Sequence, residues 1–247
     1  MNNKKNKEIL NLLYKSYIEC CDYLKKKYGK VNGNYFLTES FKSVNSKIKR
    51  TKEGLYIHHL DEDKAIMLSN KEYAIKNPYK YQLHDRLVYC NLLEHLILHI
   101  KIMEHPHKNK NINENVGIGG VVNFIVPELN DIYSGAIYTG WRKPSVELIR
   151  NLEDTYIQIL DYFINESKIH KIYKLDSKET RTKILLSSYI YNINHDSNKN
   201  ISIWTKIIKL YDKNINKKNI NKILEESQSY NNKIKSFMQI VQKEKSN

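Results

Sequence analysis

Apolar residues recur at steps of three and four positions over much of the chain, which is the spacing of an amphipathic helix. This pattern predicts helices over residues 6–28, 145–170, 179–193, 201–212 and 217–245. Two short apolar segments, residues 54–60 and 87–90, instead have the length and composition of strands. The expected fold class is therefore α+β: a mostly α-helical chain that carries one small strand-containing unit.

The second predicted strand leads into a helix with a well-marked start. Asn91 is a favourable N-cap residue, and Glu94, three positions later, completes the sequence pattern of a capping box. Apolar residues continue to Met103, and Pro106 marks the end of the helix. Residues 54–107 are thus expected to run strand, long loop, strand, helix. They lie between a basic helical N-terminal region, 1–53, and a helical C-terminal region with a basic tail, 108–247.

Positive charge is concentrated at the two ends of the 247-residue chain, whose net charge is +14. Residues 1–50 hold 12 Lys or Arg against 4 Asp or Glu, and residues 199–247 hold 11 against 4. Basic flanks around a near-neutral middle suit a polyanionic partner, most simply nucleic acid. A basic group just ahead of the predicted first strand is a candidate phosphate contact, with solvated loop residues as the alternative: Lys47, Lys49, Arg50 and Lys52.

The three cysteines are Cys20, Cys21 and Cys90, and no two of them form a Cys-x-x-Cys pair. This excludes a Cys-type zinc knuckle and a secreted disulfide framework, so we expect a cytoplasmic protein. The N-terminal segment lacks the apolar stretch of a signal peptide, and no run of about 18 apolar residues predicts a membrane span.

A glycine-rich segment contains Gly117, Gly119 and Gly120. It has no preceding strand and no GxGxxG pattern, so it is only a weak candidate for a phosphate-binding loop.

Histidines point to the chemistry of the chain, because seven of the nine lie between positions 58 and 107. His95 and His99 are four residues apart and therefore lie on one face of the predicted helix. His58 and His59 close the first strand, where successive side chains point to opposite faces. One strand histidine could join the helical pair around a metal ion, while the other deprotonates a water molecule. His84, His105 and His107 have no such geometric argument and are expected at the surface.

Residues 54–103 resemble the HNH, or ββα-metal, endonuclease finger of phage and mobile elements. The resemblance lies in the His58-His59 doublet and in the later run RLVYCNLLEHLILH, which holds Glu94, His95 and His99. It implies that His58 and His95 bind one divalent metal ion, Mg²⁺, Mn²⁺ or Zn²⁺, and that His99 completes the metal coordination or holds the scissile phosphate. It also implies that His59 is the general base that activates water for attack on phosphorus.

Arg86 departs from the family pattern, because it stands where the family has an Asn that orients the base. Asp85 could replace that Asn as the orienting acceptor, or Arg86 could bind the phosphate as part of the catalytic site. A third alternative is a finger that has lost activity and only binds. Asp61 and Asp63 could also reach the metal, although acidic residues in turns are more often solvated.

The function expected from these features is metal-dependent hydrolysis of phosphodiester bonds in DNA, double-stranded DNA being favoured. A restriction, mobile-element or phage role would fit, and a restriction enzyme would be a homodimer because palindromic sites pair with two-fold symmetry. The alternative from another class is a non-catalytic nucleic-acid-binding protein with a metal-binding finger. A toxin that acts on RNA is a third alternative.

Overall fold

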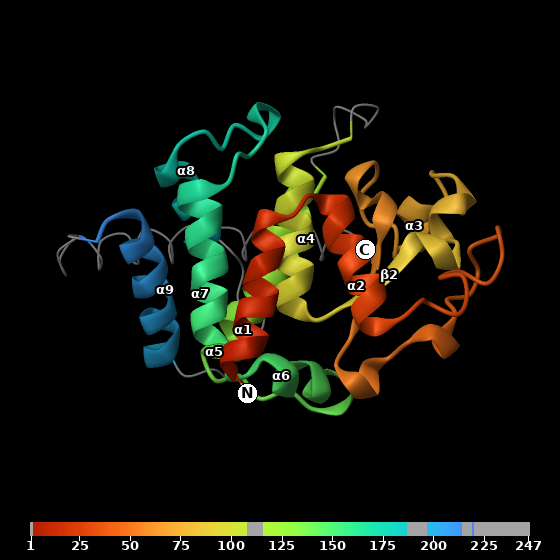
Figure 1. Ribbon diagram of the computed structural model, residues 1–247, viewed down its shortest axis with the longest axis horizontal. Helices are drawn as coiled ribbons and strands as arrows, with labels where there is room; N and C mark the ends of the chain where they lie inside the picture. The colour runs from red at the N-terminus through yellow and green to blue at the C-terminus, as the bar shows by residue number, and fades with distance from the viewer. Residues whose placement is uncertain (1, 108–115, 187–196, 214–218, 220–247) are drawn as a thin grey trace, which may run out of the picture.

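The computed structural model describes residues 2–107, 116–186, 197–213 and 219, and it is mostly helical (Figure 1). The α+β class is confirmed, since a two-stranded sheet accompanies the helices. In Figure 1 the long helices stand side by side, with the sheet and its loops to one side. The main helices are α1 (Asn2–Leu10), α2 (Tyr17–Tyr28), α4 (Leu92–Glu104), α5 (Val126–Tyr133), α6 (Lys143–Ile149), α7 (Glu153–Asp161), α8 (Lys178–Leu186) and α9 (Ser197–Tyr211).

The sheet pairs β1 (Tyr56–His59) with β2 (Leu87–Cys90) in antiparallel register, so that Tyr56 lies opposite Cys90 and His59 opposite Leu87. The long connection holds the turn η4 (Leu60–Asp63) and the short helix α3 (Lys71–Ala74). Helix α4 follows β2 directly, and the expected order of strand, loop, strand and helix is confirmed. The Asn91 side chain accepts hydrogen bonds from the backbone of Leu93 and Glu94, and Glu94 bonds back to the Asn91 backbone. The expected capping box is therefore present.

Helix α4 lies at the centre of the molecule, between α2 and the C-terminal helices, and nearly all of its side chains are buried. One apolar cluster surrounds it and takes residues from Ile9 to Ile208. All three predicted regions of the chain therefore contribute to one core. The division into regions 1–53, 54–107 and 108–247 stays a prediction.

Two of the expected long helices are interrupted. Residues 6–28 divide at Ser16. The Ser16 hydroxyl oxygen accepts a hydrogen bond from the Glu19 backbone N–H, so a new helix, α2, begins after this residue. Residues 145–170 divide between α6 and α7 at Leu152, whose backbone leaves the helical region while its side chain is buried. Apolar spacing continues across both breaks, so the spacing alone does not reveal them.

Residues 120–133 form a helical segment that is not among the helices predicted from the apolar spacing. The π-helical η7 (Gly120–Ile125) continues into α5, and Pro127 lies just after the junction, where the helix changes from π to α. Most of the helix expected at 217–245 lies outside the described residues. Within the described ranges, no helix has the length and apolar character needed to cross a lipid bilayer.

Candidate metal centre

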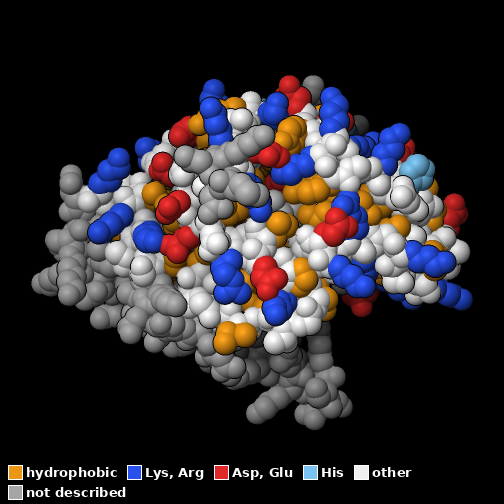
Figure 2. Space-filling view, turned by 60° about the horizontal axis from the view of Figure 1, so that its bottom comes forward, with side chains coloured by type: hydrophobic (Ala, Val, Ile, Leu, Met, Phe, Trp, Pro, Cys, Tyr) orange, Lys and Arg blue, Asp and Glu red, His pale blue; other side chains and the backbone are white. Residues whose placement is uncertain are grey.

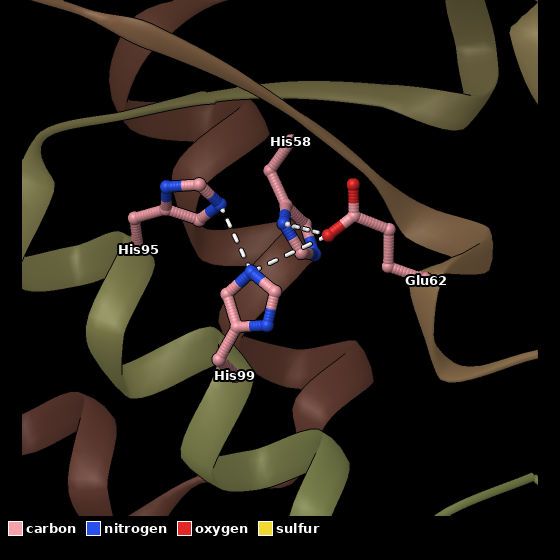
Figure 3. A group of neighbouring side chains, drawn as sticks. All are labelled: His58, Glu62, His95 and His99. Carbon is pink, nitrogen blue, oxygen red and sulfur yellow. Dashed lines mark hydrogen bonds and ion pairs between the residues drawn. The ribbon is translucent and has the colours of Figure 1, made fainter. Parts of the chain in front are cut away.

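Four potential metal ligands converge where the sheet meets α4 (Figure 3). His58 comes from β1, His95 and His99 come from α4, and Glu62 comes from the turn η4. One ligand atom from each residue lies within 4.8 Å of all the others. The structure thus brings together the three histidines predicted as metal ligands and adds a carboxylate to them.

Local structure explains why these side chains meet. His95 and His99 are one helical turn apart, and the Asn91 cap sets where that turn begins. The antiparallel pairing places His58 opposite Val88, close to the start of the same helix. The chain then turns tightly through η4, which returns Glu62 toward His58, four residues earlier.

The distances within the cluster suit a single cation. His95 Nε2 and His99 Nε2 are 3.2 Å apart, and Glu62 Oε2 lies 3.3 Å from His99 Nε2 and 3.4 Å from His58 Nδ1. A tetrahedral zinc ion with bonds of about 2.0–2.1 Å would place its ligand atoms roughly 3.3–3.4 Å apart. Side chains with these donor atoms and spacings could therefore hold a divalent metal ion without a large rearrangement.

Tyr17 of α2 holds His58 in the orientation that a metal ligand needs. Its hydroxyl oxygen lies 2.8 Å from His58 Nε2 and donates to the carbonyl of Leu60 at 3.1 Å. Since the hydroxyl proton is directed at that carbonyl, we assign the His58 proton to Nε2, from which it donates to Tyr17. The lone pair of His58 Nδ1 then faces Glu62, and among the described residues this buried nitrogen has no hydrogen-bond partner.

Burial keeps the three histidines neutral. It lowers the pKa of His58 to about 3, with the neighbouring histidines adding to the effect and Glu62 opposing it. Burial likewise lowers the pKa of His95 well below its usual value and lowers that of His99. Neutral imidazole is the form that binds metals, so the protonation state suits a ligand set.

Glu62 carries the negative charge of the cluster. Burial raises its pKa, but attraction to His58, His99 and His59 in their protonated forms, together with a hydrogen bond to His59, outweighs burial and holds the pKa below its usual range. A carboxylate beside three neutral imidazoles has no cationic partner among the groups just described. A bound divalent cation would supply the missing positive charge.

Gly120, at the start of η7, forms one wall of the centre. A Cβ atom built on Gly120 would lie 2.4 Å from both Cε1 and Nδ1 of His99, which is closer than real contacts allow. The backbone of η7 can approach the imidazole only because this residue has no side chain. The glycine-rich segment, considered above as a weak phosphate-loop candidate, packs against His99 of the cluster.

His59, the predicted general base, is fully buried on the other side of the strand. Its Nε2 lies 3.0 Å from Oε1 of Gln82, and the Gln82 amide nitrogen donates to the carbonyl of Leu68. The ring of Tyr35 packs against the imidazole, with centroids 4.6 Å apart. His59 Nδ1 lies 3.7 Å from Glu62 Oε1, so this nitrogen faces the metal cluster.

Arg86 pairs with Asp61 through two hydrogen bonds of 2.7 Å, and Asp61 is buried. The side chain that contacts His59 is Gln82 rather than Asp85, which is exposed. Asp61 therefore anchors Arg86, and the residue that the acidic turn adds to the cluster is Glu62, between the two aspartates considered from the sequence. The role of Arg86 at a phosphate stays a prediction.

The four basic residues ahead of β1 lie in two different environments. Arg50 pairs with Glu53 and donates to the Tyr28 carbonyl, so it is engaged within the protein. Lys47, Lys49 and Lys52 are exposed. Exposed lysines could contact phosphate, and their nucleic-acid role stays a prediction.

The remaining histidines of this region lie outside the cluster. His84 and His105 are exposed, as expected, and His107 is half-buried, with its backbone N–H donating to the Asp63 carbonyl. Sequence reasoning missed Glu62, Tyr17, Gln82 and Gly120. The one local sequence feature that could have pointed to Glu62 was the acidic run that follows the His58-His59 doublet.

Comparison with known proteins gives no family assignment. No protein-family model, no curated protein and no solved structure matches the chain. A functional proposal therefore depends on the residues and geometry of the metal centre.

Proposed function

We propose that the protein is a metal-dependent endonuclease that hydrolyses phosphodiester bonds in DNA. The observation that carries the proposal is the convergence of His58, His95, His99 and Glu62 beside a fifth polar group, His59, whose Nδ1 faces the cluster. These residues come from a strand–strand–helix unit with the order expected of an HNH-like finger. The basic ends of the chain suit a polyanionic substrate.

The four clustered residues would hold one divalent cation, and the unpartnered, buried Nδ1 of His58 is the feature that best fits one. The cation supplies positive charge that offsets the charge developing on a phosphate during hydrolysis. Neutral imidazoles and an ionised carboxylate are the protonation states required for binding it.

His59 is the residue positioned to accept a proton from water. The Gln82 amide nitrogen donates to Leu68, which directs Gln82 Oε1 toward His59. Because that oxygen can only accept, His59 Nε2 carries the proton and Nδ1 keeps its lone pair. A base of this kind, held in one tautomer beside the cluster, is what general-base catalysis requires.

Arg86 would contribute to binding the scissile phosphate. Its guanidinium is partly exposed, and Asp61 holds it in a fixed orientation through two hydrogen bonds. A guanidinium has further N–H donors that can bind a phosphate oxygen. DNA would thus contact Arg86 and the surface lysines, while His59 accepts the proton of the attacking water.

A second candidate function is supported by one specific observation. Glu62 would be a fourth protein ligand, and its side chain is only 13% exposed. Four protein ligands in a tetrahedral shell are typical of structural zinc sites, whereas catalytic sites keep an open position. The alternative is therefore a non-catalytic nucleic-acid-binding protein stabilised by a metal.

A nicking assay separates the two functions. Supercoiled plasmid is incubated with the purified protein and Mg²⁺, Mn²⁺, Zn²⁺ or EDTA, and the same reactions are run with His59→Ala and with His84→Ala. An endonuclease would cut with a metal and not with EDTA, His59→Ala would lose at least about a hundredfold in rate, and the exposed His84→Ala would cut normally. Binding without cutting under every metal would reject the endonuclease and leave the structural alternative.

A further inference from the structure

Trp141 is an exposed aromatic residue on a short turn, η8 (Gly140–Arg142). Its side chain is 57% exposed, whereas Trp204, the other tryptophan of the chain, is 3% exposed in α9. The guanidinium of Arg142 lies 5.2 Å from the Trp141 ring centroid and 5.9 Å from that of Tyr138. A large ring left in solvent beside a cation is a common feature of binding surfaces.

Basic side chains surround this turn. Turn η8 contacts η3 (Thr51–Glu53), which carries Lys52, and Lys143 follows Arg142 directly. We call this set the Trp141 surface: Lys52, Trp141, Arg142 and Lys143. Figure 2 turns forward the face at the bottom of Figure 1, where Lys and Arg side chains lie among Asp, Glu and apolar side chains.

Acidic residues offset part of this charge. Glu53 is paired with Arg50, Glu147 lies 3.8 Å from Lys143, and the charge of Glu128 acts on Arg142. Four basic side chains, Arg50, Lys52, Arg142 and Lys143, therefore stand beside these three acids, and a net positive charge remains. A partner that complements this surface carries negative charge and presents a flat face to the indole ring.

The Trp141 surface is connected to the metal centre through two side chains. Ser145 Oγ donates to the Arg142 carbonyl at 2.7 Å and lies 3.3 Å from the hydroxyl of Tyr56. The Tyr56 ring packs against the ring of His95, with centroids 6.2 Å apart. A Cβ atom on Gly54 would meet the Pro144 carbonyl at 2.6 Å, so the segment before β1 and the start of α6 are in close contact.

We propose that the Trp141 surface binds an unpaired nucleobase, with its flanking phosphates, in the nucleic-acid strand presented to the metal centre. The base stacks on the Trp141 indole, and the phosphates contact Arg142 and the lysines. Every base has a π face, so this contact tolerates any sequence and requires a strand that is single or locally opened. The inference rests on the proposed function, and it specifies the form of the substrate.

Tryptophan fluorescence tests the proposal, because Trp204→Phe leaves Trp141 as the sole tryptophan. The full-length variant is titrated with a single-stranded oligothymidylate DNA, the matching RNA, a duplex DNA of equal length, and heparin, all in EDTA so that no strand is cut. Single-stranded nucleic acid is expected to quench Trp141 emission. Heparin, which has charge and no bases, is expected to bind without comparable quenching. Quenching by DNA alone or by RNA alone would identify the preferred strand.

Affinity measurements on variants with Trp204 intact complete the test. Trp141→Ala is expected to weaken single-strand binding at least about fivefold, as the loss of one stacked base would, while Trp141→Phe retains most of the affinity. Unchanged affinity in Trp141→Ala, or no quenching by any nucleic acid, would overturn the proposal. A His59→Ala protein that is quenched normally and does not cut separates this surface from the chemistry. Quenching without cutting in the unmodified protein would reject only the endonuclease.

Discussion

The Nδ1 atom of His58 lies 3.4 Å from the Oε2 atom of Glu62 in a buried position where both atoms are electron-rich. With the proton of His58 assigned to Nε2, where Tyr17 accepts it, Nδ1 keeps its lone pair, and Glu62 is ionised. Two lone pairs that face each other at this distance repel unless a cation lies between them. This relationship is the main structural reason to expect a metal ion, and Glu62 Oε2 also lies 3.3 Å from His99 Nε2.

Replacing the carboxylate should weaken metal binding. Glu62→Gln keeps the shape of the side chain and removes its charge, so we expect at least about a tenfold loss of affinity for Zn²⁺ or Mn²⁺ by isothermal titration calorimetry. Glu72→Gln is the matched control, because Glu72 is exposed on α3. Equal affinity in the two variants would show that Glu62 is not a ligand.

The hydroxyl of Tyr17 should matter to the metal although Tyr17 does not reach it. Tyr17→Phe removes the group that fixes the tautomer of His58 and leaves the Nε2 proton buried and unpaired, so metal affinity should fall about 10- to 100-fold. Tyr14→Phe is the control, since Tyr14 is 75% exposed. If Tyr17→Phe destabilises the fold yet binds metal normally, Tyr17 has only a structural role.

Two adjacent glycines offer a paired test of the wall formed by η7. Gly120→Ala should displace His99, because the added Cβ would meet the imidazole at 2.4 Å, whereas Gly119→Ala would meet only the Asn123 amide nitrogen at 3.8 Å. We expect Gly120→Ala to lower metal affinity by about tenfold or more, as other disturbances of ligand orientation do. Competition with a chromophoric chelator measures both variants, and a similar result for both would contradict the assigned wall.

Gln82 should influence the chemistry without influencing metal binding. Gln82→Ala removes the acceptor that orients His59, so kcat for DNA cleavage should fall about tenfold or more while KM and metal affinity stay near their original values. Gln158→Ala serves as the control because Gln158 is exposed on α7. A parallel loss of metal affinity in Gln82→Ala would indicate a structural role and count against His59 as the base.

Local patterns in the sequence were sufficient for the strand–strand–helix unit and for three of the four clustered residues. Helical periodicity placed His95 and His99 on one face, and the Asn91 cap fixed the start of α4. Glu62 escaped prediction because the path of the turn η4 decides which acidic side chain points inward. Tyr17 and Gly120 reach the centre from segments distant in sequence, through packing that no local pattern encodes.

The helix breaks at Ser16 and Leu152 could not be predicted from apolar spacing, because that spacing continues across both breaks. They arise from the local backbone geometry at these two residues.

The most direct test of the central claim is the metal content of the purified protein, measured by elemental analysis together with X-ray absorption of the bound ion. The account predicts one divalent ion per chain, coordinated by three imidazole nitrogens and a carboxylate oxygen, and loss of most of that ion in His95→Ala. It would be contradicted if the protein, supplied with Zn²⁺, Mn²⁺ or Mg²⁺, retained no ion. An ion that stayed fully bound after His95→Ala, with an unchanged ligand set, would contradict it equally.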